Sequence, residues 1–177
     1  MRIRVAHPGE ALELALLGER LWRETYAGLI PAPDLGAYLA EAFGPEKQRA
    51  ELVDPASMTL LIEWNGRLLG YAWLRAGGPE SESARFALAR PLEVARFYVD
   101  RSLHGTGAAQ SLMAAVLAHA ASAGHDAVWL QVWEQNPRAI RFYAKAGFTE
   151  VGETEFLVGT ESYRDRVLVH RVSTDGP

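Results

Sequence analysis

Two glycines stand where a helix is expected to begin, in His104-Gly105-Thr106-Gly107-Ala108-Ala109. The segment follows the apolar run Phe97-Tyr98-Val99, and apolar residues recur after it at helical spacing. A helix N-terminus offers unpaired N–H groups and a positive potential, and glycine lets a backbone approach a ligand closely. A strand, a glycine turn and a helix in this order therefore predict an anion-binding site, most often for phosphate.

Two common phosphate motifs do not fit this turn well. A P-loop needs a lysine and a hydroxyl residue directly after its last glycine, but Ala108 and Ala109 follow Gly107. A Rossmann fingerprint needs a third glycine, where the chain has Gln110. Because Glu134 follows the next expected strand, as the ribose-binding acid of that fingerprint would, the dinucleotide interpretation stays open as the minor alternative.

A second block lies downstream, from Asn136 to Phe148, and has the sequence NPRAIRFYAKAGF. Together with the glycine turn it resembles the GNAT N-acetyltransferase superfamily, whose two signatures are Q/R-x-x-G-x-G/A after a strand and N-x-x-A-x-x-F-Y-x-K-x-G-F. The departure is His104, where glutamine or arginine is usual. In this turn the phosphate is bound mostly by backbone N–H groups, so the histidine is expected to be tolerated. The segments TYAGLIP (25–31) and FLVG (156–159) are similar to the branch that includes the spermine/spermidine acetyltransferases.

The resemblance implies a mixed α/β fold of three layers, in which helices flank a mostly antiparallel mixed sheet. The sheet is splayed between the strand that ends at Val99 and the strand of residues 127–132, and the co-substrate acetyl-CoA lies in the opening. No metal is implied. By resemblance, the residues that bind acetyl-CoA are Phe97, Tyr98, Val99, His104, Gly105, Thr106, Gly107, Ala108, Ala109, Asn136, Tyr143 and Lys145.

The same resemblance implies an enzyme that moves an acetyl group directly from acetyl-CoA to a primary amine, with small amines and polyamines favoured. Only about one alkyl amine in 2,500 is neutral at pH 7, so a carboxylate that collects the proton is expected. Glu93 is the candidate, because it precedes Val99 by six residues on one strand and the two are expected to share a face. The Val99 N–H would stabilise the charge on the thioester oxygen, and Tyr143 would protonate the departing sulfur. The absence of cysteine agrees with a transfer that forms no acyl-cysteine.

Each of these residues also has a purely structural interpretation. Glu93 could be an ordinary strand residue paired with a nearby arginine, and Tyr143 could only pack on its helix. Asn136 is also a favoured helix N-cap, and His104 is expected to contribute its backbone more than its side chain. At the level of function, the alternatives are a protein, peptide N-terminal or amino-acid acetyltransferase, and a CoA-binding module without turnover.

The elements that position these residues follow from periodicity and turn signals. Helices are predicted over 10–26, 35–43, 46–53, 106–123 and 136–146, and strands over 1–6, 59–64, 67–74, 91–99, 126–132, 148–158 and 162–172. Asn65-Gly66 predicts a hairpin turn, and Pro137 and Gly147 bound the last helix. Residues 76–90 predict a surface loop.

Composition bounds the remaining possibilities. The 177 residues fit one domain, 1–177, with variable front helices over about 8–54 and the cofactor core over about 58–172. The net charge of −4 disfavours nucleic acid, no run of about 18 apolar residues suggests a membrane span, and the absence of cysteine fits the cytoplasm. The expected partner is a small-molecule amine. A homodimer also fits the resemblance, since dimers are common in that superfamily.

Overall fold

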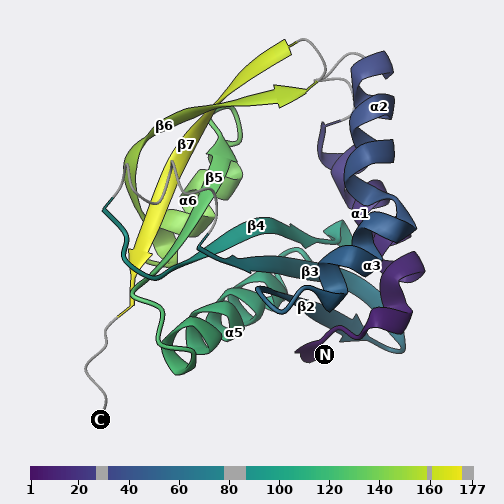
Figure 1. Cartoon of the computed structure of the whole chain (residues 1–177), viewed down its shortest axis with the longest axis horizontal. Coiled ribbons are helices and arrows are strands. Elements are labelled where there is room, and N and C mark those ends of the chain that lie inside the picture. The colour runs from purple at the N-terminus through teal and green to yellow at the C-terminus, as the bar shows by residue number, and fades with distance from the viewer. Residues whose placement is uncertain (27–31, 78–86, 159–160, 173–177) are drawn as a thin grey trace.

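The computed structural model describes residues 1–26, 32–77, 87–158 and 161–172. Within them the chain forms one seven-stranded mixed sheet, in the order β1-β2-β3-β4-β5-β7-β6, with helices on both faces (Figure 1). The strands are β1 (Arg2–Val5), β2 (Ser57–Trp64), β3 (Arg67–Ala76), β4 (Pro91–Val99), β5 (Ala127–Trp133), β6 (Thr149–Val158) and β7 (Glu161–Arg171). The helices are α1 (Ala11–Tyr26), α2 (Ala32–Phe43), α3 (Pro45–Val53), α5 (Ala108–Ser122) and α6 (Pro137–Lys145), and the 3-10 turns are η1 (Pro8–Glu10) and η2 (Arg101–Leu103). The predicted mixed α/β fold is confirmed.

The observed elements follow the predicted ones, with differences at two helix starts. α2 begins at Ala32, before the predicted start at residue 35, and α5 begins at Ala108 because Gly107 takes the N-cap position with φ of 85°. The hairpin is confirmed, since Asn65 and Gly66 both adopt positive φ, 50° and 72°, as a two-residue turn between β2 and β3 requires. Predictions for residues 27–31, 78–86, 159–160 and 173–177 lie outside the described residues.

The sheet is divided between β4 and β5. The two strands are parallel and pair over Pro91–Glu93 of β4 only, opposite Ala127–Trp129 of β5. Beyond Glu93, β4 pairs with β3 alone, and β5 continues beside β7. In Figure 1 the β1–β4 half lies nearly level while β5, β6 and β7 rise steeply away from it. The splay that the resemblance implied is thus present, and it opens toward the end of β4.

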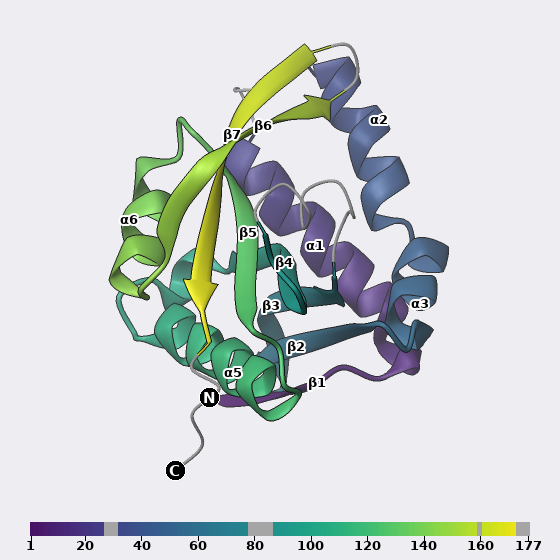
Figure 2. The same cartoon turned by 60° about the vertical axis from the view of Figure 1, so that its left-hand side comes forward.

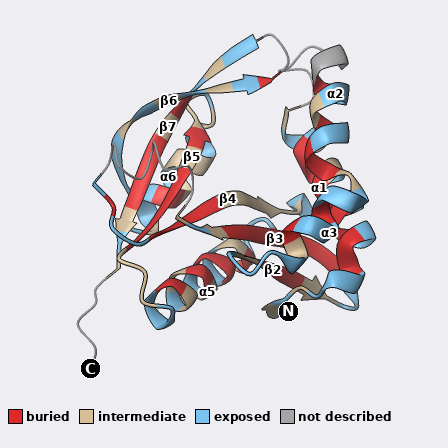
Figure 3. Ribbon diagram, in the orientation of Figure 1, coloured by how far each residue is buried: buried red, intermediate tan, exposed pale blue. Residues whose placement is uncertain are grey.

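The two faces of the sheet have separate cores. We call them the α5 face, where α5 packs, and the α1 face, where α1, α2 and α3 pack (Figures 1 and 2). The buried residues of α5 are Ala108, Leu112, Met113, Val116 and Ala120, and the buried apolar residues of α1 that join the opposite core are Leu14, Leu17, Leu21 and Trp22. Figure 3 shows these buried stripes turned toward the strands. None of the helices described is long and apolar enough to cross a membrane.

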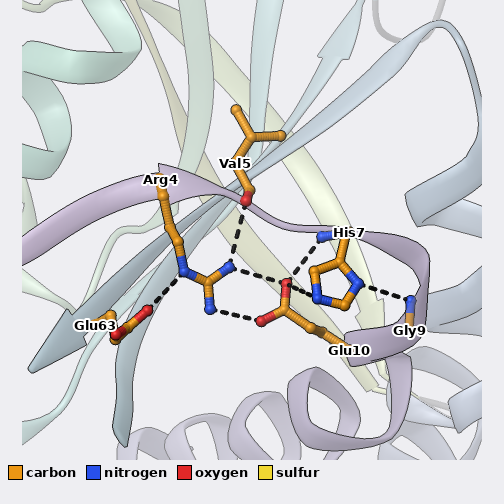
Figure 4. Close-up of polar contacts among 6 residues, drawn as sticks. All are labelled: Arg4, Val5, His7, Gly9, Glu10 and Glu63. Atoms are coloured by element: carbon orange, nitrogen blue, oxygen red, sulfur yellow. Dashed lines mark hydrogen bonds and ion pairs between the residues drawn. The ribbon is translucent and has the colours of Figure 1, made fainter. Parts of the chain in front are cut away.

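Arg4 ties the start of α1 to the sheet (Figure 4). Its guanidinium donates to both carboxylate oxygens of Glu10, at 2.9 and 2.6 Å, and to Glu63 on β2 at 2.7 Å. Glu10 also accepts from the His7 N–H at 2.9 Å, so the same carboxylate caps η1. Chiefly through its hydrogen bonds, Arg4 lowers the pKa of Glu10. α1 is therefore fixed at its N-terminal end, and its C-terminal end reaches the opening between β4 and β5.

Candidate active site

A cavity of about 610 Å³ lies in the opening between β4 and β5. The predicted site residues that line it are Glu93, Phe97, Tyr98, Val99, His104, Ala109, Asn136 and Tyr143. Those that do not are Gly105, Thr106, Gly107, Ala108 and Lys145. The three predicted catalytic residues therefore share one cavity. Lys145 lies outside it, exposed at the last position of α6.

Backbone groups of β4 point into the opening. The Asp100 N–H donates to Leu69 on the β3 side at 2.8 Å, and donors alternate between the two edges of an antiparallel strand. The Tyr98 N–H therefore also points toward β3. The N–H groups of Phe97 and Val99 point away from β3, into the opening between β4 and β5. A ligand in the gap can pair with these groups as a further strand would.

A bulge in β4 changes which side chains share a face. Ala95 has no partner, and the pairing with β3 shifts register between Trp73 and Leu74. Because a bulge inserts one residue, side chains six positions apart across it point to opposite faces. Val99 packs on the α5 face, whereas Glu93 lies on the α1 face with Trp73. The expectation that Glu93 and Val99 share a face is wrong, and both line the cavity only because the sheet is open there.

Glu93 is a buried carboxylate, with 6% of its surface exposed. It accepts a hydrogen bond of 2.9 Å from Arg75 Nε, and Arg75 Nη2 lies 2.6 Å from the same oxygen. Burial raises the pKa of Glu93, while the charge and hydrogen bond of Arg75 act in the opposite direction. The structure therefore holds a carboxylate with enhanced proton affinity at the wall of the cavity, as a general base requires.

The glycine turn has the backbone that an anion site needs. Gly105 and Gly107 adopt φ of 80° and 85°, a left-handed conformation that favours glycine. Nothing lies within 4 Å of the position that a Cβ would take at either residue, so the space in front of both is open. Gly107 is the N-cap of α5 and has no side chain to accept a hydrogen bond. The first N–H groups of the helix can therefore donate to a ligand. These features fit a phosphate group resting on the turn.

Asp100 holds the chain between β4 and this turn. Its carboxylate accepts from the Ser102 N–H at 2.9 Å and lies 2.6 Å from Arg20 of α1. Burial opposes ionisation, but the hydrogen bonds from Ser102 and Arg20 prevail and lower the pKa of Asp100 to about 2. The turn is thereby anchored to α1 as well as to the sheet.

His104 was expected to contribute mainly its backbone, but its side chain also makes a contact at the cavity. It lines the cavity and hydrogen bonds to the backbone of Val99. Burial and the charge of Arg138 lower the pKa of His104, and the hydrogen bond opposes that shift. At neutral pH the imidazole is therefore mainly uncharged.

Tyr143 is 7% exposed and packs against aromatic neighbours while it lines the cavity. Its ring lies 5.2 Å from Phe142, 5.7 Å from Phe148 and 6.1 Å from Phe97 between centroids. Burial, assisted by Tyr26, raises the pKa of Tyr143. The hydroxyl therefore keeps its proton at neutral pH and can donate it.

Asn136 caps α6, as the sequence predicts. Its Oδ1 accepts from the Ala139 N–H at 3.1 Å, and Pro137 takes the first helical position. Because the residue also lines the cavity, the cap turns the start of α6 toward the opening. The helix ends before Gly147, whose φ of 85° is the left-handed conformation expected at that point.

Sequence reasoning missed a second buried carboxylate in the cavity. Asp165 on β7 is 8% exposed and pairs across the ladder with Trp133 of β5. Burial raises the pKa of Asp165 to about 6. The sequence held an indication of this residue. Asp165, Val167 and Val169 are spaced two residues apart on β7 and so share one face, and the two valines are in the core. Burying a carboxylate is costly unless it is paired, so an aspartate at an inward position of such a strand stands out in the sequence.

Comparisons with known proteins agree with this geometry. The sequence matches the profile of the Acetyltransferase (GNAT) family over residues 19–148. An uncharacterised N-acetyltransferase of Mycobacterium bovis is 32% identical over 163 residues, which cover 92% of this chain and 98% of that protein. The structure of the PaiA N-acetyltransferase of Thermoplasma acidophilum, in complex with coenzyme A, has a TM-score of 0.76 and covers 97% of this chain and 99% of its own, at 19% identity. The ribosomal-protein-S18-alanine N-acetyltransferase of Escherichia coli has a TM-score of 0.67 over 99% and 96% of the two chains, at 14% identity.

Proposed function

The chain belongs to the GNAT acetyltransferase family, and from this membership we propose that it transfers an acetyl group from acetyl-CoA to the primary amine of a small molecule. One observation supports the proposal most strongly. The opening between β4 and β5 presents the backbone of Phe97 and Val99, a buried tyrosine hydroxyl and buried carboxylates to a single cavity. The dinucleotide interpretation of the glycine turn has no comparable support.

The residues of the opening fit coenzyme A. The amides of a pantetheine arm would pair with the outward N–H and C=O groups of Phe97 and Val99. The pyrophosphate would accept from the open turn between His104 and Ala109, at the N-terminus of α5. That a protein of this fold is known in complex with coenzyme A supports this placement.

The proposed chemistry is a direct transfer. Bound acetyl-CoA supplies the acetyl group as a thioester, which an amine can attack without a protein nucleophile. Glu93 accepts the proton that the ammonium must lose, directly or through water. The Val99 N–H stabilises the negative charge that develops on the carbonyl oxygen as the N–C bond forms. Tyr143 donates its proton to sulfur as the C–S bond breaks, and the second proton that the nitrogen loses as the amide forms restores the Tyr143 hydroxyl.

One carboxylate of the cavity supports a small amine as acceptor. Asp165 is buried there without an ion-pair partner among the described residues, which favours a cationic molecule, whereas Glu93 is paired with Arg75. The lining also contains arginines, of which Arg96 is paired with Glu51. A polyamine is the finer proposal, motivated by the likeness of residues 25–31 and 156–159 to the spermine/spermidine branch. The second candidate is a peptide N-terminus, since the fold is also that of an enzyme named for acetylating the alanine of a ribosomal protein.

The test is release of free CoA thiol from acetyl-CoA in the presence of a panel of amines. The panel contains alkyl monoamines, diamines, polyamines, amino acids and short peptides with free N-termini. We expect turnover above the hydrolysis rate with small amines and little with peptides. Peptide turnover alone would favour the second candidate. Tight binding of CoA without turnover on any amine would contradict the enzyme proposal and favour a CoA-binding module.

A further inference from the structure

Asp165 is a buried charge for which the described part of the chain provides no counter-ion. No lysine, arginine or histidine among the described residues forms an ion pair with it, and burial is the cause that sets its pKa, about 6. Its neighbours on β7 are engaged elsewhere: Arg164 lies 3.7 Å from Glu153 and Arg166 lies 3.0 Å from Glu150. Glu93, by contrast, is paired with an arginine. An ionised carboxylate in this situation is stabilised by a cation that arrives with a ligand.

Aromatic rings surround the same part of the cavity. Trp22 lies 4.5 Å from Tyr26 and 4.6 Å from Tyr38, Tyr26 lies 6.1 Å from Trp133, and Trp133 lies 6.1 Å from Tyr163, all between ring centroids. All five rings line the cavity. The charge of Asp165 raises the pKa of Tyr26 and of Tyr38, which places the carboxylate near both hydroxyls, although burial is the larger cause for each. Aromatic faces beside a carboxylate are the usual surroundings of a bound ammonium group.

The rings come from both halves of the molecule. Trp22 and Tyr26 are supplied by α1, Tyr38 by α2, and Trp133 and Tyr163 by the strands on the far side of the opening. Figures 1 and 2 show β6 and β7 extending past the rest of the sheet toward α2, which β6 contacts. The subsite is thus closed from two sides by elements far apart in the sequence.

Asp165 lies too far from Glu93 for one amine to contact both. On β5, Glu93 is opposite Trp129 and Asp165 is opposite Trp133, so the two are separated by four residues and two strand spacings. That separation corresponds to about 16 Å between Cα atoms. Both lie on the α1 face of the sheet, because ladder partners point the same way and Trp129 and Trp133 differ by an even number of residues. A flexible molecule with a charge at each end could contact both carboxylates in one orientation.

We propose that Asp165 and the five rings around it bind a second, non-reacting ammonium group of the acceptor, so that the preferred substrates are primary amines with a further cation at the other end of an apolar chain. This inference rests on the proposed acetyl transfer, and it specifies the acceptor class. The reacting nitrogen lies at the gap beside Val99, and the distal ammonium lies against Asp165. The chain between them crosses the apolar ring faces.

The experiment compares linear alkyl diamines with monoamines of the same length, in acetyl transfer and in direct binding. For the wild-type protein we expect kcat/KM for the best diamine to exceed that of its matched monoamine by about tenfold or more, which corresponds to one desolvated ion pair with cation–π contacts. We also expect an optimum in chain length, since the two subsites are a fixed distance apart. Asp165→Asn should remove most of the diamine preference, mainly through KM. Glu161→Gln, which removes a carboxylate of the same strand outside the cavity, should retain it.

Three results would overturn the inference. Equal kcat/KM for diamine and monoamine in the wild type would show that no second cation is bound. An equal loss on both substrates in Asp165→Asn would instead make this residue a general base or a structural residue. Calorimetric titration of the diamine, without acetyl-CoA, separates the inference from the proposed function: binding that weakens about tenfold in Asp165→Asn supports the subsite even if no amine is turned over. Unchanged binding in that variant would contradict it.

Discussion

Tyr143 and Glu93 both line the cavity, and the proposed transfer gives them opposite tasks, as acid and as base. Burial raises the pKa of the Tyr143 hydroxyl, so the resting group is protonated and has a proton to give to the departing sulfur. Burial also raises the pKa of Glu93, where it increases the affinity for a proton taken from an ammonium group. The charge and the hydrogen bond of Arg75 limit that increase.

Replacing Tyr143 by phenylalanine is expected to lower kcat by about a hundredfold, since a positioned acid contributes a factor of that order. The affinity for CoA should change little, because the ring and its packing remain. Steady-state kinetics and CoA titration measure the two effects. Tyr71→Phe is the matched control, as it removes a buried tyrosine hydroxyl that does not line the cavity. An unchanged kcat in Tyr143→Phe would eliminate its role as the acid.

For Glu93→Gln we expect a lower kcat/KM and a flatter dependence on pH. The wild-type rate should fall on acidification as Glu93 becomes protonated, at a pH above the usual range of glutamate because burial raises the pKa. The variant has no such group to protonate, so that limb should disappear. A full pH–rate profile of both proteins measures this. If the variant keeps a limb of normal height and position, another group is the base.

At the scale of elements, a buried ion pair holds α3 against β4. Arg96 Nη1 lies 2.6 Å from Glu51, and its guanidinium stacks 4.5 Å above the Trp73 ring and donates to Ala42 at 3.0 Å. Gln48 donates to the same carboxylate at 3.1 Å. Through Ala42 the network also holds α2, whose Tyr38 ring lines the cavity.

Arg96→Met would remove the arginine that is hydrogen bonded to the buried Glu51 and leave it only Lys47, 4.0 Å away, so we expect the free energy of unfolding to fall by about 3 kcal/mol. Urea denaturation measures this. Arg23→Met is the matched control, since Arg23 pairs with Glu19 on the exposed side of α1 and such pairs contribute about 0–1 kcal/mol. Similar stability losses in the two variants would contradict a structural role for the buried pair.

Sequence patterns predicted the elements better than the details inside them. The bounds of β4, the Asn136 cap and the hairpin at Asn65 depend on local residue types, which the sequence states directly. The bulge at Ala95 depends on how β3 and β4 align, and the apolar pattern of the strand does not show it. As a consequence, the predicted face of Glu93 was wrong although its strand was right.

At the scale of the whole molecule, the cavity exists because two half-sheets diverge and helices from the front of the chain close it. Tyr26 of α1 meets Trp133 of β5 there, a contact between segments more than a hundred residues apart. No local pattern predicts that meeting, which explains why the grouping of Asp165 with these rings was not predicted. The local structures of the glycine turn and of α6 were predicted because each is formed by a single continuous segment.

The buried charge of Asp165 is expected to reduce stability at neutral pH. The folded protein binds this proton more tightly than the unfolded chain, because burial raises the pKa from its usual value near 3.9 to about 6. Its contribution to stability is therefore greatest below about pH 4 and is lost as the pH rises through 6. Asp165→Asn should raise the free energy of unfolding at pH 8 by about 1–3 kcal/mol and change it little at pH 3.5.

Urea unfolding of both proteins at the two pH values measures this effect. Glu161→Gln should show no such pH-dependent difference, because its carboxylate is exposed. A variant Asp165→Asn that is less stable at pH 8 would mean that the carboxylate has a stabilising partner within the protein.

The most direct test of acetyl transfer follows the acetyl group itself. Acetyl-CoA labelled with heavy isotopes in the acetyl group is incubated with the protein and the best amine, and mass spectrometry is applied to both the amine and the protein. Direct transfer predicts the label on the amine nitrogen, one free CoA per acetylated amine, and no labelled protein at any time point. Label that appears first on the protein, or CoA release without a labelled amine, would contradict it.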